Sequence, residues 1–196
     1  MGIYPQRTRL MLSTRLAGVL HSRGLHYGWV VVATTFLAML ATAGAVSAPG
    51  VMLVPLQQEF GWQNGDISVA MAVRLILYGL LGPFAAAFLN RFGLRRVVIV
   101  ALLTIALGTA GSLVMTSVWQ LVLLWGVVVG LGTGMIAMVL GATVATRWFA
   151  HRSGLVMGLL AASLATGQLV FLPLLAQLTA SHGWRTALCV VVGALL

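Results

Sequence analysis

Long apolar runs, separated by short stretches that hold nearly all of the arginines, constrain this sequence more than any other feature. Hydrophobic residues make up 61% of the 196 positions and charged residues only 7%, whereas a soluble domain carries about 25% charged residues. The runs are long enough for helices that cross a bilayer, which need about 20 apolar residues each. They lack the polarity alternation, over segments of about ten residues, of membrane β-barrel strands. The sequence therefore predicts an all-α membrane protein.

Turn signals and charges divide the chain into a leader and six apolar segments. Residues 1–28 contain four arginines and no apolar stretch suited to a signal peptide, which predicts a cytosolic leader. Membrane spans are expected at about 29–51, 67–90, 97–115, 118–145 and 154–178, with a sixth apolar segment at 184–196. At 1.5 Å per residue, a helix of about a dozen residues reaches about 18 Å, short of a hydrocarbon core of about 30 Å. We therefore expect the sixth helix to be truncated.

The distribution of arginine predicts the orientation. The net charge of +9 rests on arginine alone, because the chain contains no lysine. Nine of the eleven arginines fall in the leader and in the segments 91–96 and 147–152. Cytosolic loops are enriched in basic residues, so we expect a multi-pass protein of the cell membrane with its N-terminus in the cytosol. Arginines placed in this way serve topology, and no nucleic-acid partner is expected.

Small residues recur at four-residue intervals in three of the expected spans. Such rows let helices approach closely in a membrane, where lipid supplies no hydrophobic drive for association. Tight packing is the favoured interpretation, and the alternative is that these faces also slide during a transport cycle. The expected packing positions are Gly82 and Pro83 in the second span, Gly126, Gly130 and Gly134 in the fourth, and Gly154 and Gly158 in the fifth.

One arginine lies inside a span. Arg74 falls about eight residues into the second span, roughly 12 Å deep, where an ionised side chain is costly and by default a functional candidate. Our hypothesis is that it faces a central cavity and binds an anionic substrate or an acid from another part of the protein. The alternatives are hydrogen bonds to neighbouring carbonyls and snorkelling to the interface. Tyr78 lies one turn further on the same face and is a second candidate ligand. Gln168 in the fifth span is a third, although a helix–helix hydrogen bond is favoured for it.

The segment 86–96 resembles the cytosolic loop signature of the major facilitator superfamily. Asn90, Arg91, Gly93, Arg95 and Arg96 carry this resemblance, with asparagine where the family has aspartate. More narrowly, the segments 28–32, 59–62 and 147–154 are similar to the monocarboxylate porters and the oxalate/formate antiporters. The resemblance implies the six-helix N-terminal half of a major facilitator fold, with a missing C-terminal six-helix half as its partner and a gating role for the loop. It implies secondary active transport of a small solute, such as a mono- or dicarboxylate, by alternating access.

The sequence gives little support to other classes of function. It holds no zinc-protease motif and no intramembrane histidine, so no enzymatic activity is expected. The single cysteine, Cys189, rules out an internal disulfide, and we expect neither a metal site nor a cofactor. A channel or a non-transporting membrane scaffold remains the alternative hypothesis. Saturable flux driven by a gradient would favour the transporter, whereas ohmic conductance would favour a channel.

Overall fold

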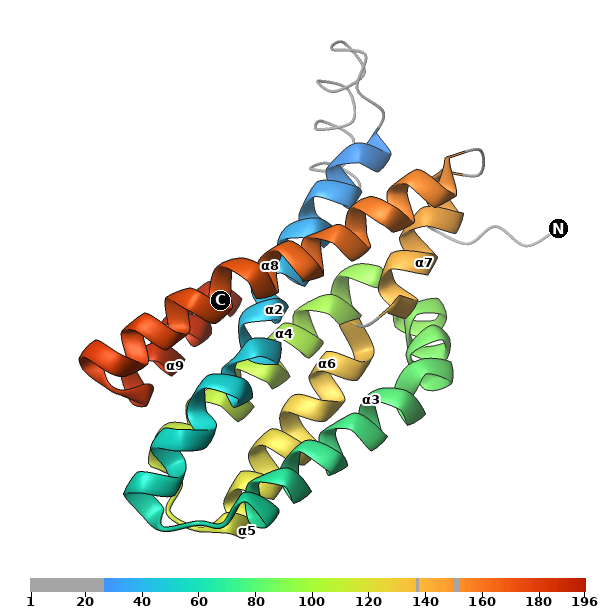
Figure 1. The fold of residues 1–196 in the computed structure, drawn as a ribbon. Helices are drawn as coiled ribbons and strands as arrows, with labels where there is room; N and C mark the ends of the chain where they lie inside the picture. Colours follow the sequence, from blue (N-terminus) through green and yellow to red (C-terminus); the bar gives the residue numbers. More distant parts are fainter. Residues whose placement is uncertain (1–26, 137, 150–151) are drawn as a thin grey trace, which may run out of the picture.

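The computed structural model describes residues 27–136, 138–149 and 152–196, and the regular structure of these residues is entirely helical (Figure 1). Five segments are long and apolar enough to cross a membrane, namely Gly28–Phe60, Asn64–Phe92, Leu94–Val114, Val118–Thr146 and Ser153–His182. This confirms the predicted all-α membrane class. The helices are α2 (Tyr27–Phe60), α3 (Asn64–Phe92), α4 (Leu94–Gly111) with the 3-10 turn η1 (Ser112–Val114), α5 (Val118–Leu121), the π-helix η2 (Val122–Val129), α6 (Gly130–Ile136), α7 (Met138–Trp148), α8 (Ser153–His182) and α9 (Trp184–Leu195).

The first helix differs most from the expected span. It runs through Pro49 and Pro55 to Phe60 rather than ending near 51. Each proline removes one backbone donor and so frees the carbonyl four residues earlier, a defect that neighbouring helices and side chains can accommodate in a membrane bundle. α9 is short, with 12 residues.

Two glycines connect consecutive helices without a loop. Gly93 joins α3 to α4 with φ 82° and ψ 152°, and Gly183 joins α8 to α9 with φ 84° and ψ 161°. This region of backbone space is essentially restricted to glycine. In each junction the glycine N–H donates to a carbonyl four residues earlier, at 3.1 Å. The glycine of the resembled loop signature is therefore required by the geometry of the turn.

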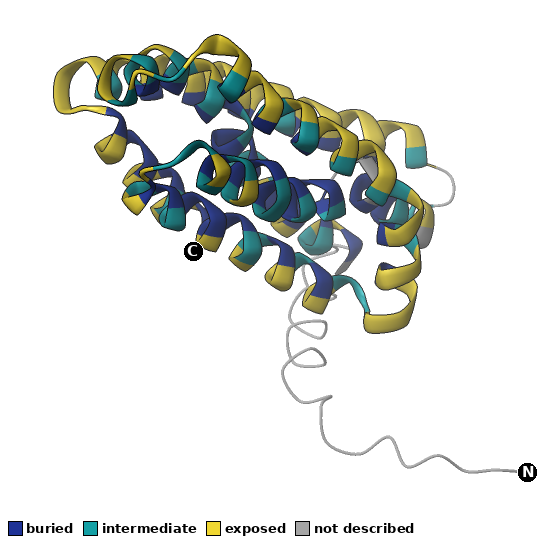
Figure 2. Ribbon diagram, turned by 90° about the horizontal axis from the view of Figure 1, so that it is seen from below, coloured by how far each residue is buried: buried dark blue, intermediate teal, exposed yellow. Residues whose placement is uncertain are grey.

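The helices pack in an order that differs from their order in the chain. α2 lies along α8, and α3 lies against η2 and α6. α4 covers another side of η2 and α6, and α9 contacts α8, α4 and α2. Buried residues face the interior of this bundle, whereas the outer faces are exposed (Figure 2). Many exposed side chains are large and apolar, for example Leu107 at 69% and Leu169 at 77%. Such faces suit lipid or a further protein surface and would be unfavourable in water.

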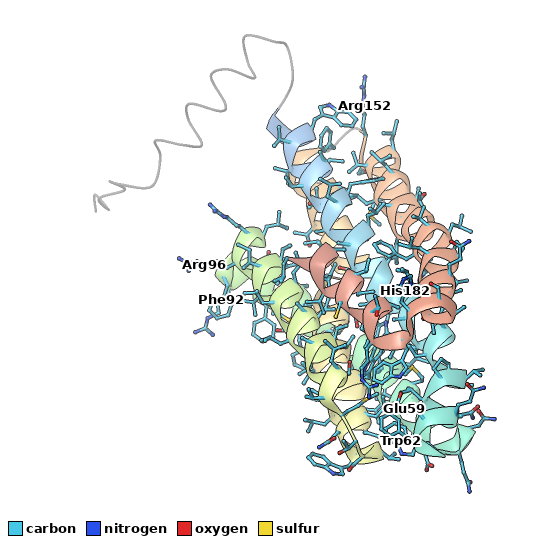
Figure 3. All side chains as sticks on the ribbon, turned by 90° about the vertical axis from the view of Figure 1, so that its left-hand side faces the viewer. Glu59, Trp62, Phe92, Arg96, Arg152 and His182 are labelled. Atoms are coloured by element: carbon cyan, nitrogen blue, oxygen red, sulfur yellow. The ribbon has the colours of Figure 1, made fainter. Side chains whose placement is uncertain are left out.

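Charged residues lie at both ends of the bundle, in addition to the buried Arg74. Glu59 and Trp62 lie at one end, and Arg152 lies at the other (Figure 3). Because α3 starts at Asn64 beside the first end and finishes at Phe92, the arginines of its junction with α4 lie away from Glu59. The described part of the chain thus separates its basic turns from this carboxylate along the helix axes.

Candidate functional site

A cavity of about 300 Å³ lies between α2, α3, α6 and α8. Arg74, Tyr78 and Gln168, the three candidate ligand residues of the sequence, all line it. The remaining lining residues are Met39, Thr42, Val46, Pro49, Met71, Leu75, Thr133, Ile136 and Leu164. The structure therefore brings together, from α3 and α8, side chains that are almost a hundred positions apart in the sequence.

Helical spacing explains which residues reach the cavity. Positions three or four residues apart share one face of a helix, and each of the four helices presents such a set. α3 contributes Arg74 and Tyr78, α8 contributes Leu164 and Gln168, and α2 contributes a longer stripe that ends at Pro49. Arg74 is the most enclosed of the three candidates, with only 8% of its surface exposed, while Tyr78 retains 37%.

A row of glycines seats the part of α3 that carries these two residues. A Cβ atom placed on Gly130 would lie 3.3 Å from the Arg74 Cα atom, and one on Gly134 would lie 3.4 Å from the Tyr78 Cα atom. One turn earlier, Gly126 faces Val73 at 3.1 Å in the same way. Larger side chains at these positions would push α3 outward, so this row determines how far Arg74 and Tyr78 project into the cavity.

The Arg74 guanidinium has no acidic partner in the part of the chain that the structure describes. No hydrogen bond or ion pair joins it to another described residue, and neither Glu59 nor Asp66 lines the cavity. A buried cation requires hydrogen bonds and a compensating charge, and the described residues around Arg74 provide neither. An anion in the cavity could supply both.

The other polar groups of the lining fall into two kinds. The hydroxyls of Thr42 and Thr133 donate to carbonyls of their own helices, those of Ala38 and Val129, both at 2.8 Å. Tyr78 and Gln168 make no hydrogen bond to any described residue, so the helix–helix bond favoured for Gln168 is not present among them. Two uncharged donors thus remain available beside Arg74.

Several predicted residues lie away from the cavity. Asn90, Arg91, Arg95 and Arg96 are exposed at the α3–α4 junction, where the Arg91 Cζ atom lies 5.5 Å from the Phe92 ring centroid. The expected packing positions Gly82, Gly154 and Gly158 do not face a neighbouring helix: an added Cβ would meet no described atom within 4 Å. Pro83, beside Gly82 in α3, is likewise exposed. A four-residue spacing shows which residues share a face but not which face is covered.

One of the closest approaches between helices occurs at a glycine that the spacing rule did not select. A Cβ on Gly167 of α8 would lie 2.5 Å from the Ala43 Cβ and 2.9 Å from the Leu40 carbonyl oxygen, both in α2. The run of small residues at 41–48 was the available signal in the sequence for this contact. Since Gln168 follows Gly167 directly, this contact positions a residue of the cavity.

A polar cluster that the sequence did not predict closes one end of the bundle. The Glu59 carboxylate accepts hydrogen bonds from Trp184 Nε1 at 2.5 Å and from Arg185 Nη2 at 2.6 Å. Arg185 Nε also donates to the Leu113 carbonyl oxygen at 3.4 Å, and its Cζ atom lies 4.5 Å from the Trp184 ring centroid. The cluster joins α2, η1 and α9 on the side of the bundle opposite Arg152.

Helices long and apolar enough to cross a membrane, packed around a cavity with a buried cation, define a multi-pass membrane protein. Its sequence over residues 34–196 matches the Major Facilitator Superfamily, and the chain belongs to this family of transporters. The family resemblance of the loop signature is thereby confirmed.

Within this family, the chain is similar to several curated proteins named monocarboxylate transporters. The chain is 29% identical to monocarboxylate transporter 14 of Homo sapiens over 164 residues, which cover 84% of the chain and 32% of the relative. It is 30% identical to monocarboxylate transporter 9 of Mus musculus over 173 residues, or 86% of the chain and 33% of the relative. For monocarboxylate transporter 11 of Mus musculus the identity is 30% over 163 residues, or 83% and 36%. The chain thus spans about a third of the length of these relatives.

Proposed function

We propose that this chain forms one half of a secondary active transporter that carries a small organic anion, such as a mono- or dicarboxylate, by alternating access. The observation that carries the proposal is the Arg74 guanidinium, buried in a cavity and without an acidic partner among the described residues. Membership in a transporter family and similarity to proteins named monocarboxylate transporters support it.

The chemistry of the cavity suits a carboxylate. A guanidinium can donate two parallel hydrogen bonds to a carboxylate, which gives the pair both strength and a fixed direction. The Tyr78 hydroxyl, one turn along α3, and the Gln168 amide, from α8, can donate to the remaining lone pairs or to a neighbouring polar group of the ligand. Because these donors come from different helices, a relative movement of α3 and α8 would break the site and release the anion.

The proposal includes the orientation of the chain in the membrane and its partner. We propose an orientation in the cell membrane with the N-terminus and the α3–α4 junction in the cytosol, and a second six-helix half that completes the cavity. The junction residues Asn90, Arg91, Gly93, Arg95 and Arg96 would then act on gating from the cytosolic side. Single cysteines introduced at Asn90 and at Gln63, after replacement of Cys189 by serine, test this orientation with a membrane-impermeant thiol reagent. Labelling of the cysteine at 90 from outside intact cells would contradict it.

Substitution of Arg74 tests the function. In proteoliposomes, counterflow of a radiolabelled carboxylate should saturate with concentration, and Arg74→Gln should weaken binding about 10- to 100-fold, since a hydrogen bond to a charged group contributes about 1.5–3 kcal/mol. Arg74→Lys should retain part of the affinity, because the charge remains but the paired donors are lost. Arg152→Gln, which removes an exposed arginine far from the cavity, is the matched control. Unchanged affinity in Arg74→Gln would refute the assignment, and a linear current–voltage relation would indicate a channel instead.

A further inference from the structure

The lining of the cavity is mostly apolar apart from the group that would hold the charge. Arg74 is the single charged residue among those that line it, and seven of the others have purely hydrocarbon or thioether side chains. Thr42 and Thr133 offer no free donor, because their hydroxyls bond to the carbonyls of their own helices. A ligand in this site therefore meets one cation, two uncharged polar groups and an apolar wall formed by all four helices.

The size of the cavity exceeds that of a carboxylate group alone. A cavity of about 150 Å³ in a protein core accommodates one benzene ring, and the cavity beside Arg74 measures about 300 Å³. A one- or two-carbon anion at Arg74 would leave most of the apolar lining in contact with water or empty. A ring or branched chain attached to the carboxylate would cover it, and hydrophobic burial would add to the affinity.

Two methionines widen the range of apolar ligand groups that can fit in the cavity. Met39 of α2 and Met71 of α3 line the cavity on adjoining helices. The unbranched, polarisable methionine side chain adapts to irregular shapes and makes favourable contacts with aromatic rings. These residues favour a cavity wall that adapts to bulky ligands of different shapes, rather than a wall that fits a single small molecule.

We infer that the anion recognised by this site is amphipathic, with its carboxylate at Arg74 and a bulky apolar body, aryl or branched alkyl, against Met39, Met71 and Leu164. The inference rests on the proposed function and deepens it. Small polar anions occupy the same charge site without the apolar contacts. Affinity rises with the size of the body until the cavity is filled, by about fourfold for each buried methylene.

A series of carboxylates of equal charge tests the inference. Binding of acetate, butanoate, 4-methylpentanoate and 3-phenylpropanoate is measured by their competition with a labelled carboxylate in proteoliposomes, with 3-phenylpropanamide as the uncharged control. We expect affinity to increase at least tenfold from acetate to 3-phenylpropanoate and to be lost with the amide. Leu164→Ala should weaken 3-phenylpropanoate about three- to tenfold and acetate by a clearly smaller factor. Leu169→Ala, on the exposed face of the same helix, should alter neither.

The outcomes separate this inference from the function on which it rests. If acetate binds as tightly as 3-phenylpropanoate, or if Leu164→Ala weakens both equally, the apolar body plays no part in recognition and the inference is overturned. Arg74-dependent anion transport would survive that result. If no carboxylate competes and Arg74→Gln changes nothing, the proposed function itself fails, and the inference fails with it.

Discussion

Adding one methyl group at Gly167 should separate α2 and α8, two of the four helices that line the cavity. In Gly167→Ala the new Cβ would lie 2.5 Å from the Cβ of Ala43, an atom fixed to the α2 backbone, and 2.9 Å from the Leu40 carbonyl oxygen. Non-bonded carbon atoms prefer about 3.5–4.0 Å, so α2 and α8 would have to move apart by about 1 Å. No flexible side chain is available to absorb this displacement.

A matched control is available on the same helix. Gly158→Ala adds the same methyl group to α8 where no described atom lies within 4 Å. Both substitutions gain the same helix propensity, up to about 1 kcal/mol, so the difference between them isolates the clash. Overpacking costs about 1–3 kcal/mol, and we expect Gly167→Ala to be less stable than Gly158→Ala by this amount.

The assay is reversible unfolding in mixed detergent micelles, followed by far-ultraviolet circular dichroism. Ala43→Gly in the Gly167→Ala background should recover part of the loss, because it removes the nearest of the clashing atoms. Equal stability of Gly167→Ala and Gly158→Ala would refute the argument, since α2 and α8 would then have room that the structure does not show.

Three further features of the fold are tested by substitutions in the same unfolding assay. Gly93→Ala should cost about 1–3 kcal/mol, because its backbone conformation is essentially restricted to glycine, whereas Gly65→Ala in the first turn of α3 should be neutral or stabilising. Trp125→Phe should break no hydrogen bond, since the buried Trp125 Nε1 has no partner among the described residues. The free energy of unfolding should therefore fall by less than about 3 kcal/mol, and a larger loss would indicate a hydrogen-bond partner outside those residues. Glu59→Gln should cost less than about 1 kcal/mol, because the pair with Arg185 is partly exposed, and this loss should shrink in high salt.

The sequence predicted the candidate site better where one helix supplied the residues than where several did. Arg74 and Tyr78 are four positions apart, and helical periodicity alone places them on one face. Gln168 reaches the same cavity only because α8 packs along α2, and that pairing depends on the approach at Gly167, which periodicity does not encode. The cavity lining from α2 and α6 was absent from the prediction for the same reason.

The fold shows a similar division between local and tertiary information. The apolar runs were sufficient to predict the membrane class, since burial in lipid depends on composition over about 20 residues. They did not predict that α2 continues past Pro49 to Phe60, because the penalty of a proline depends on what surrounds the freed carbonyl. The glycines at 126, 130 and 134 contact α3 while those at 154 and 158 face outward, although both sets have the same spacing.

The contact between Gly130 and the backbone of Arg74 places a seam between two helices directly beneath the single charge among the described residues that line the cavity. A shift of α3 along this seam would carry the Arg74 Cα atom with it, because Gly130 places no side chain between the two helices at this point. An anion bound to Arg74 would be displaced when α3 moves, and its binding energy would therefore affect which position of the helix is favoured.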